Sequence, residues 1–439
     1  MNEILKTDEK LQKLLSPQKA QAGIVYNPSQ YALTIPHDGK SYVFHTLTKQ
    51  CVEAELPLSC TAGEGFDDLI AGYFLVPREQ DESTFYMSLL KLMNTVYKYN
   101  GPSYYTVLPT LACNARCVYC YEEGAAPLSM NMETAAQTAR YIIESSDRRR
   151  PVAIRWFGGE PMLGVKFIDR ISEDLLNAGV DYFSYTISNG SLITPAIVDK
   201  MAGLWKLRDI QISMDGAEED YRRRKCYLEY CDVYRKVMEA VSLMSEAGIH
   251  VTVRCNVDEE NWPRIPRYLE DMRRGVSDKR NVSLYFAPLY DVRFGGDDIA
   301  MWKRIITMEP EILKAGFKLY RLKEIDMTFR RWFCISDCGA SVVFPDGKLS
   351  PCEHYPIRNV FGDIWRGETD PETRKDFCRK DRIREKCRNC PYLPLCTPFA
   401  TCPLEEADCR DVQGLFVEDA VIKAVEKQKE SADDGCSSN

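Results

Sequence analysis

Three cysteines within eight residues are the part of the chain best suited to carry chemistry. Cys113, Cys117 and Cys120 are separated by three and then two residues, so their thiolates can converge on one side of a loop. Three sulfur ligands suit an iron–sulfur cluster with one iron open to an outside ligand, because a cluster held by protein alone takes four thiolates. The alternatives are a zinc site short of one ligand and three unrelated buried cysteines.

A second group of cysteines lies between residues 334 and 409. It holds nine of the 18 cysteines in the chain, which has only four histidines. Iron–sulfur or four-thiolate zinc sites are therefore favoured over histidine-rich ones. With Cys378 set aside, eight thiolates make two complete four-cysteine sets. These eight are Cys334, Cys338, Cys352, Cys387, Cys390, Cys396, Cys402 and Cys409.

Between the two cysteine groups, short apolar stretches alternate with amphipathic helical patterns, which predicts a parallel sheet with right-handed crossovers. The expected strands are Tyr104–Leu108, Ala153–Phe157, Tyr182–Ile187, Ile210–Met214, His250–Asn256 and Val282–Ala287. The expected helices are Glu133–Ser145, Val165–Ala178, Pro195–Leu204, Val233–Ala247 and Ile265–Met272. Six such units are too few for a closed eight-stranded barrel.

Polar motifs follow the expected strands, and active sites of parallel sheets lie at the carboxyl ends of the strands. The segment Gly158-Gly159-Glu160-Pro161 comes after the second strand. Its two glycines would let the backbone approach a ligand closely. Ser188-Asn189-Gly190 ends the third strand, and Ser213-Met-Asp215-Gly216 ends the fourth.

Together these motifs resemble the signature of the radical S-adenosylmethionine (SAM) enzymes. The resemblance rests on the cysteine spacing, the aromatic Tyr119 before the third cysteine, and the later Gly-Gly-Glu-Pro segment. It implies that the three cysteines hold a [4Fe–4S] cluster whose fourth iron binds SAM. An electron from the cluster would cleave SAM to methionine and a 5′-deoxyadenosyl radical that abstracts a substrate hydrogen. It also implies an open, partial (β/α)6 barrel, which matches the six predicted units.

By this resemblance, SAM contacts are expected beside the cysteines and at the strand ends. The residues are Tyr119 (adenine), Gly158, Gly159, Glu160 and Pro161 (amino group), Ser188, Asn189, Ser213 and Asp215 (ribose and carboxylate), Arg224 and Arg254. Arg224 is preferred among the basic residues 222–225, which all compete for the SAM carboxylate. At Arg254, ligand contact and simple strand capping both fit.

The second cysteine group resembles the SPASM extension of these enzymes, which holds two auxiliary [4Fe–4S] clusters. Cluster I would take Cys334, Cys338, Cys352 and Cys402, and cluster II would take Cys387, Cys390, Cys396 and Cys409. The Cys396–Cys402 gap departs from the usual spacing and leaves the role of Cys402 open. Two zinc sites are the alternative to the whole assignment.

Glu353 directly follows Cys352. It fits the position of an acidic residue that takes a proton from the substrate in the related sulfatase-maturing enzymes, so a catalytic role as base is expected. A hydrogen-bonding role beside the cluster is the alternative.

Residues 1–100 are expected to form a winged-helix-like α+β domain, because an Asp-Gly turn at residues 37–40 joins two alternating stretches. This block resembles the leader-peptide recognition domain of radical SAM peptide maturases, where the peptide adds a strand to a sheet edge. An N-terminal cap on the barrel is the alternative. The barrel is expected at 101–310, a bridging segment and SPASM domain at 311–425, and a flexible tail at 426–439.

The bulk composition limits the partners. With 439 residues, 45% hydrophobic and 28% charged, the chain has the composition of a soluble globular protein of two or three domains. It has no run of apolar residues long enough for a membrane span and no signal-peptide core near the first residue, so a cytoplasmic location without a membrane partner is expected. A net charge of −8 argues against nucleic acid as the main partner.

These features predict a radical SAM oxidoreductase that matures a ribosomally made precursor peptide bound through its leader. Auxiliary clusters without an open iron would remove an electron, which implies a net oxidation such as an intramolecular thioether or a C–C or C–O cross-link. The reductant would be a donor such as flavodoxin or ferredoxin. The alternatives are a formylglycine-generating sulfatase maturase, a peptide epimerase and a non-catalytic iron–sulfur or zinc scaffold that binds peptide.

Overall fold

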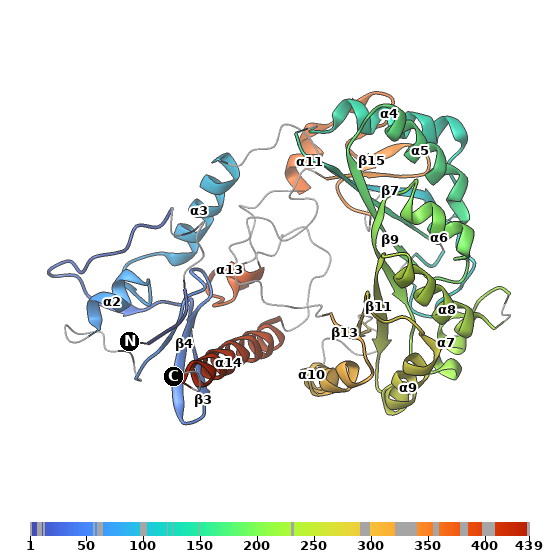
Figure 1. Cartoon of the computed structure of the whole chain (residues 1–439). Coiled ribbons are helices and arrows are strands. Elements are labelled where there is room, and N and C mark those ends of the chain that lie inside the picture. Colours follow the sequence, from blue (N-terminus) through green and yellow to red (C-terminus); the bar gives the residue numbers. More distant parts are fainter. Residues whose placement is uncertain are drawn as a thin grey trace. The chain divides into compact units, whose positions relative to one another are not determined.

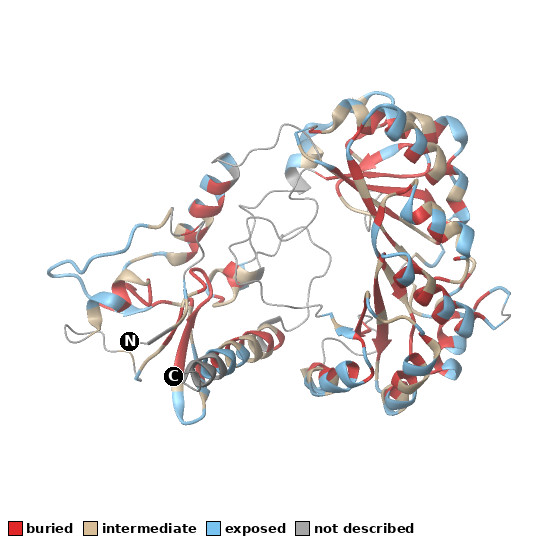
Figure 2. Cartoon of the chain, viewed as in Figure 1, coloured by how far each residue is buried: buried red, intermediate tan, exposed pale blue. Residues whose placement is uncertain are grey.

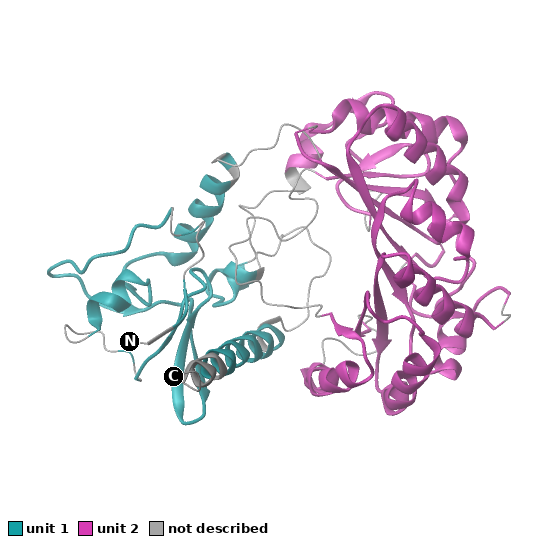
Figure 3. Cartoon of the chain, viewed as in Figure 1, with its two compact units in different colours: residues 1–98, 323–333, 379–439 teal, residues 99–322, 334–378 magenta. Residues whose placement is uncertain are grey.

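The computed structural model describes most of the chain, in two compact units (Figure 3). The described residues are 2–6, 11, 14–55, 58, 65–96, 103–120, 122–124, 126–147, 149–229, 232–289, 299–320, 340–353, 360–377, 385–396 and 409–436. Unit 1 comprises residues 1–98, 323–333 and 379–439, and unit 2 comprises residues 99–322 and 334–378.

Unit 1 is built on a four-stranded antiparallel sheet in the order β1-β5-β4-β3, of which β3 and β4 are labelled in Figure 1. Its strands are β1 (Asn2–Leu5), β3 (Ala32–His37), β4 (Lys40–His45) and β5 (Cys51–Glu53). The predicted hairpin between β3 and β4 is confirmed. Asp38 and Gly39 have φ values of 50° and 73°, the left-handed conformation that a two-residue hairpin turn requires.

Both faces of this sheet are covered. One face is covered by helix α2 (Phe66–Ala71) and by a smaller sheet of β2 (Tyr26–Pro28) and β6 (Leu75–Pro77). On this face Val43 packs against Phe74 and neighbouring apolar side chains. Helix α14 (Cys409–Cys436) packs on the opposite face, where Tyr42 and Phe44 of β4 meet its valines. Helix α3 (Glu82–Val96) completes the N-terminal part of the unit.

The chain end differs from the sequence-based expectation of a flexible tail at 426–439, because α14 continues to Cys436. Val417, Val421 and Val425 recur every four residues and give the helix an apolar face, which is buried against the sheet.

Unit 2 contains the predicted partial barrel. Six parallel strands follow one another in chain order: β7 (Tyr104–Thr110), β8 (Val152–Gly158), β9 (Tyr182–Ser188), β10 (Leu207–Ser213), β11 (His250–Val257) and β12 (Val282–Pro288). All six strands were predicted from the sequence. Figure 2 shows that burial concentrates in these strands, while the helices expose their outer sides.

The crossover helices are α4 (Met132–Ser145), α5 (Val165–Asn177), α6 (Pro195–Ala202), α7 (Glu218–Lys225), α8 (Val233–Glu246), α9 (Ile265–Gly275) and α10 (Ile299–Lys314), with 3-10 turns η1 (Pro161–Gly164) and η2 (Trp262–Arg264). Five of these helices, α4, α5, α6, α8 and α9, agree with the sequence pattern, whereas α7 and α10 were not predicted. Within the described residues, no helix combines the length and apolar character needed to cross a lipid bilayer.

The sheet of unit 2 extends beyond the six strands to eleven. Strand β13 (Lys318–Leu319) adds parallel to β12, and β14 (Ser341–Val343) adds parallel to β7. An antiparallel series then follows, made of β15 (Lys348–Ser350), β16 (Gly362–Asp363) and β17 (Gly367–Glu368). The structure thus has a C-terminal extension joined to the first barrel strand. Three short helices lie between this sheet and α14 in the sequence: α11 (Pro371–Phe377) in unit 2, and α12 (Glu385–Arg388) and α13 (Leu393–Cys396) in unit 1.

Candidate active site

The cysteine loop follows β7 and is held against the end of helix α7. Ala115 and Tyr227 form an isolated β-bridge. The N–H groups of Arg116 and Val118 donate to the carbonyl oxygens of Lys225 (3.1 Å) and Arg224 (3.0 Å). These backbone hydrogen bonds fix the conformation of the loop without using its cysteine side chains.

The three thiols of the loop are half-buried and near enough to influence one another electrostatically. Burial raises the pKa of all three, that of Cys117 to about 11, and the Lys225 cation acts in the opposite direction on Cys117 and Cys120. Among the described residues, no three Cys, His, Asp or Glu side chains are arranged to hold a single metal ion. A four-iron cluster has a different requirement, because each thiolate binds a separate iron.

The Gly-Gly-Glu-Pro segment lies directly against the cysteine loop. Gly158 has a φ of 116°, and a Cβ there would overlap the Thr110 carbonyl oxygen. A Cβ at Gly159 would overlap the carbonyl oxygens of Leu111 and Ala112. The sequence suggested that these glycines let the backbone approach a ligand closely. In the structure, they leave room for the backbone carbonyl groups of the segment that leads into the cysteine loop.

Glu160 and Pro161 begin the turn η1, and Glu160 is buried. Its carboxylate accepts hydrogen bonds from the Met162 N–H (3.1 Å), the Ser188 hydroxyl (2.8 Å) and the Asn189 N–H (2.8 Å). Burial raises the pKa of Glu160, and these hydrogen bonds act against that rise. Glu160 therefore joins the ends of β8 and β9.

Asn189 continues this connection to the cysteine loop. Its side-chain N–H donates to the Asn114 side-chain oxygen at 2.9 Å, and Asn114 in turn donates to Ser191 at 2.9 Å. Asn114 was not singled out in the sequence, because an asparagine between two cysteines carries no signal of its own. The predicted residues Ser188 and Asn189 are thus brought to the cysteine loop.

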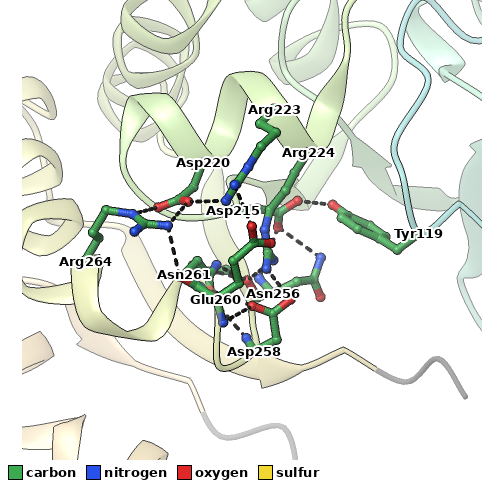
Figure 4. A network of polar contacts seen from close by, with 11 residues as sticks. Tyr119, Asp215, Asp220, Arg223, Arg224, Asn256, Asp258, Glu260, Asn261 and Arg264 are labelled. Atoms are coloured by element: carbon green, nitrogen blue, oxygen red, sulfur yellow. Dashed lines mark hydrogen bonds and ion pairs between the residues drawn. The ribbon is translucent and has the colours of Figure 1, made fainter. Parts of the chain in front are cut away.

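Asp215 lies at the centre of a second network, shown in Figure 4. It is fully buried, and its Oδ1 accepts hydrogen bonds from the backbone and side-chain N–H groups of Asn256, both at 3.0 Å. Its Oδ2 accepts a short hydrogen bond from the Tyr119 hydroxyl and lies 3.4 Å from Lys225 Nζ. Both oxygens of Asp215 are therefore occupied by the chain itself.

Of the four neighbouring basic residues, Lys225 is the one at this site. Its ammonium group is buried, lies 5.6 Å from the centre of the Tyr119 ring, and interacts electrostatically with Cys117. Burial opposes its charge, but Asp215, Cys117 and Tyr221 together act against burial, so the pKa of Lys225 is raised. Arg224, the residue preferred from the sequence, forms an ion pair with Asp258 and donates to the Asn256 carbonyl oxygen (3.2 Å).

A further part of the network fixes helix α7 to the turn η2 (Figure 4). Arg264 donates to Asp220 at 2.8 and 2.5 Å, and Arg223 pairs with the same buried carboxylate at 3.0 Å. Asn261 donates to the Asn256 carbonyl oxygen at 2.9 Å. This arrangement holds Lys225, at the end of the helix, in place.

The other two predicted contact residues, Ser213 and Arg254, are partly exposed. Ser213 ends β10 and is half-exposed. Arg254, in β11, donates to the Asn256 side-chain oxygen at 2.8 Å. This hydrogen bond to Asn256 favours a capping role for Arg254.

Glu353 forms an ion pair with Arg155 of β8. Arg155 also donates to the Thr106 hydroxyl at 3.2 Å and lies over the Phe157 ring at 5.0 Å. Arg155 could not be identified from the sequence, because its partner lies 198 residues away. The pair ties the residue after Cys352 to the barrel strands.

The second cysteine group is only partly described. Cys352 follows β15 in unit 2, and Cys387 and Cys390 are buried in unit 1. Cys396 and Cys409 lie in helices α13 and α14, and their side chains are outside the described part. Cys334, Cys338 and Cys402 lie wholly outside the described residues.

Comparison with known proteins gives one family match. Residues 107–272 match the family model described as the radical SAM superfamily. Among curated proteins, an uncharacterized protein of Methanocaldococcus jannaschii is 29% identical over 125 residues, which cover 27% of this chain and 41% of that protein. The chain spans about half the length, or less, of the curated relatives it matches (41% and 54%).

Two solved structures share the fold. One is native anSMEcpe with bound AdoMet, with a TM-score of 0.57 and 16% identity, covering 74% of this chain and 99% of that chain. The other is Streptococcus suis SuiB bound to S-adenosylmethionine, with a TM-score of 0.53 and 11% identity, covering 88% of this chain and 96% of that chain. At these identities the likeness shows the fold.

Proposed function

Because residues 107–272 match the radical SAM superfamily model, we propose that the protein is an enzyme that uses SAM and a [4Fe–4S] cluster to modify a peptide oxidatively. The observation that carries the proposal is the meeting of the cysteine loop with Glu160, Asp215 and Lys225 at the carboxyl ends of parallel strands. When bound, the cluster and SAM would supply the 5′-deoxyadenosyl radical that abstracts a hydrogen atom from the substrate.

The residues present fit these cofactors. Cys113, Cys117 and Cys120 are soft sulfur ligands, and three of them leave one iron of a four-iron cluster for SAM. The buried ammonium of Lys225 lies beside the loop, where it can form a charge-assisted hydrogen bond with the SAM carboxylate. We assign this role to Lys225 in place of Arg224, which is held by Asp258.

The remaining side chains position these groups. Asp215 keeps Lys225 charged and fixes Tyr119, which we place near the adenine. Glu160 and Asn189 hold the ends of β8 and β9 against the cysteine loop. Gly158, Gly159 and Pro161 shape the backbone that would face the SAM amino group, with Ser188, Ser213 and Arg254 at neighbouring strand ends.

The proposed substrate is a ribosomally made precursor peptide bound through its leader by the N-terminal part of unit 1. Two proteins of similar fold, anSMEcpe and SuiB, have been crystallised with the Cp18Cys peptide and the precursor peptide SuiA. Among the residues that the structure describes, strand β3 ends its sheet with β4 on one side, so its other edge suits addition of a peptide strand. The proposed product carries an intramolecular thioether or another C–C or C–O cross-link.

In this proposal Glu353 accepts a proton from the substrate, and Arg155 holds it in place. The two cysteine sets given above would hold two auxiliary clusters, which would supply an acceptor for the electron that is left when the new bond closes. A flavodoxin or ferredoxin would supply electrons to the SAM-binding cluster.

A formylglycine-generating sulfatase maturase is the second candidate. The fold likeness to anSMEcpe favours it, since that structure is matched over 99% of its length. The part of this chain outside the covered 74% weighs against it, because a sulfatase maturase needs no leader-recognition domain such as the one expected at residues 1–100.

The test uses the full chain, reconstituted anaerobically with iron and sulfide. Reductant, SAM and a short peptide whose gene lies beside that of the enzyme are added, and the mass of the peptide is measured by mass spectrometry. About twelve irons, the content of three four-iron clusters, and a peptide lighter by two hydrogens are expected. An unchanged peptide mass with deuterium uptake from solvent would indicate an epimerase instead. About four irons with bound zinc would contradict the auxiliary clusters.

A further inference from the structure

The Cys387–Cys390 segment is part of the core of unit 1. The exposed fractions of the two cysteines are 7% and 8%. The Cys390 N–H donates to the Cys387 carbonyl oxygen at 3.1 Å, and the Leu393 N–H donates to the Cys390 carbonyl oxygen at 3.1 Å. The segment therefore forms a tight turn with two buried thiols, a donor pair that suits an iron–sulfur cluster or zinc.

The turn packs on the N-terminal part of the unit. Cys387 and Leu393 share one apolar cluster with Tyr31, Leu47 and the α3 residue Tyr86. This cluster lies next to the hairpin of β3 and β4, since Tyr31 directly precedes β3 and Leu47 follows β4.

Hydrogen bonds connect the same partners. The Thr46 hydroxyl donates to the Pro391 carbonyl oxygen at 2.6 Å, and the Gln30 side chain donates to the Arg388 carbonyl oxygen at 3.3 Å. Chain segments more than 340 residues apart thus meet at the turn that carries the cysteines.

Helix α14, which begins at Cys409, is fixed to the same sheet. Its valines pack against Ile35 and Phe44, and Lys429 pairs with Asp38 in the hairpin turn at 2.9 Å. A Cβ at Gly414 would lie 2.8 Å from the Tyr392 hydroxyl oxygen, so the helix also packs closely on the cysteine turn.

Cys352, from the same cysteine-rich region, belongs to unit 2, where it follows the β14–β15 hairpin. The C-terminal cysteines are therefore divided between the two units. A metal centre at Cys387 and Cys390 would be built into the unit that contains the N-terminal sheet, whereas the Cys352 thiol belongs to the barrel unit.

We infer that the centre held by Cys387 and Cys390 is a structural part of the N-terminal sheet unit, and that loading it stabilises β3, β4 and α3. The free energy of metal binding adds to the stability of the fold that contains the ligands. The centre thereby controls peptide capture at the β3 edge, a step that rests on the proposed function. Loss of iron at this centre would weaken substrate binding even with the barrel intact.

Hydrogen-exchange mass spectrometry on the full chain tests the inference without any peptide. The chain is compared before and after anaerobic reconstitution with iron and sulfide. We expect amide exchange in residues 32–45 and 82–93 to slow at least tenfold on loading. Equal exchange rates in the two states would overturn the inference, whether or not a peptide product is ever found.

Two cysteine variants locate the effect. Cys390→Ala should lose most of the protection of residues 32–45, while Cys352→Ala, which removes a thiol from the barrel unit, should keep it. Protection lost equally in both variants, or kept in both, would contradict the assignment of this centre to unit 1. If Cys390→Ala fails to fold, the exchange rates of the wild-type chain before and after loading with iron and sulfide still test the inference.

Discussion

Lys225 and Asp215 are the side chains on which the candidate site depends most. Both are buried, and they form an ion pair within reach of the cysteine loop. An ion pair in such a place is poor support for stability, because desolvation costs about as much as the attraction returns. Its position instead keeps one ammonium group charged at the point where an anionic cofactor group would bind.

Replacing Lys225 should therefore impair cofactor binding. We expect Lys225→Ala to weaken SAM binding by about 10- to 100-fold, since a hydrogen bond to a charged group contributes about 1.5–3 kcal/mol. Equilibrium binding of labelled SAM to the reconstituted protein measures this. Lys225→Arg should restore most of the affinity, and Arg222→Ala, on the exposed side of the same helix, should leave it unchanged. Equal losses in the alanine variants would contradict the role of Lys225.

Glu353 should act after SAM cleavage. We expect Glu353→Gln to lower the rate of peptide product formation at least 100-fold, the size of a general-base contribution, while 5′-deoxyadenosine still forms. Chromatography of both products from one reaction gives the two rates. If product and 5′-deoxyadenosine fall together, Glu353 acts on the fold or on SAM through Arg155, and not as the base.

At the scale of elements, the cysteine loop is shaped mainly by backbone contacts. Its N–H groups bond to the end of α7, and its carbonyl groups lie against Gly158 and Gly159. The two glycines thus serve the packing of one loop on another, and any side chain at these positions would push the loops apart.

Gly159→Ala should consequently reduce cluster binding. The added Cβ would overlap backbone oxygens of Leu111 and Ala112, which cannot move away as a flexible side chain could. We expect iron bound at Cys113, Cys117 and Cys120 to fall by more than half, measured by iron analysis and visible absorbance. Gly203→Ala, at the end of α6 and away from the loop, is the matched control and should bind iron normally.

The sequence was sufficient for the six parallel strands and for five of the barrel helices, because the spacing of apolar residues and the glycines at strand ends are local signals. Helices α7 and α10 were not predicted. It was not sufficient to choose among residues 222–225, since the choice depends on the rotation of α7 and on Asp258 taking Arg224. Arg155 was missed for a similar reason, because its partner Glu353 is distant in the chain. The short strands β13, β16 and β17 carry too little pattern to be found.

At the scale of the whole molecule, unit 1 is built from segments near both ends of the chain. The sequence indicated an N-terminal domain and a separate cysteine-rich domain, whereas Cys387, Cys390 and α14 share a compact unit with the N-terminal sheet. Only contacts between distant segments reveal this.

Unit 1 should also lose stability in acid because of His45. This side chain is buried, accepts from the Thr48 N–H at 3.1 Å and lies 3.2 Å from the Ser29 hydroxyl, which donates to Glu82. Burial lowers the pKa of His45 to about 3, and Lys49 adds to this. The unfolded chain therefore takes up a proton near pH 6.5, and the folded one does not.

The contribution of neutral His45 is complete above pH 6.5 and is lost as the pH falls toward 3. We expect a slope of about 1.4 kcal/mol per pH unit in the stability of unit 1. The raised pKa of Glu82, caused by burial, reduces the slope at the acid end. Hydrogen exchange in β3 and β4, corrected for the intrinsic rate, gives the slope. His45→Gln should flatten it, and an unchanged slope would contradict this explanation.

The most direct test of the central claim is the reductive cleavage of SAM. The full chain, loaded with iron and sulfide and reduced under anaerobic conditions, should convert SAM to methionine and 5′-deoxyadenosine in equal amounts. The variant with alanine at Cys113, Cys117 and Cys120 should form neither. If the wild-type protein binds iron at these cysteines but yields no 5′-deoxyadenosine above the variant, the proposed radical SAM activity is wrong.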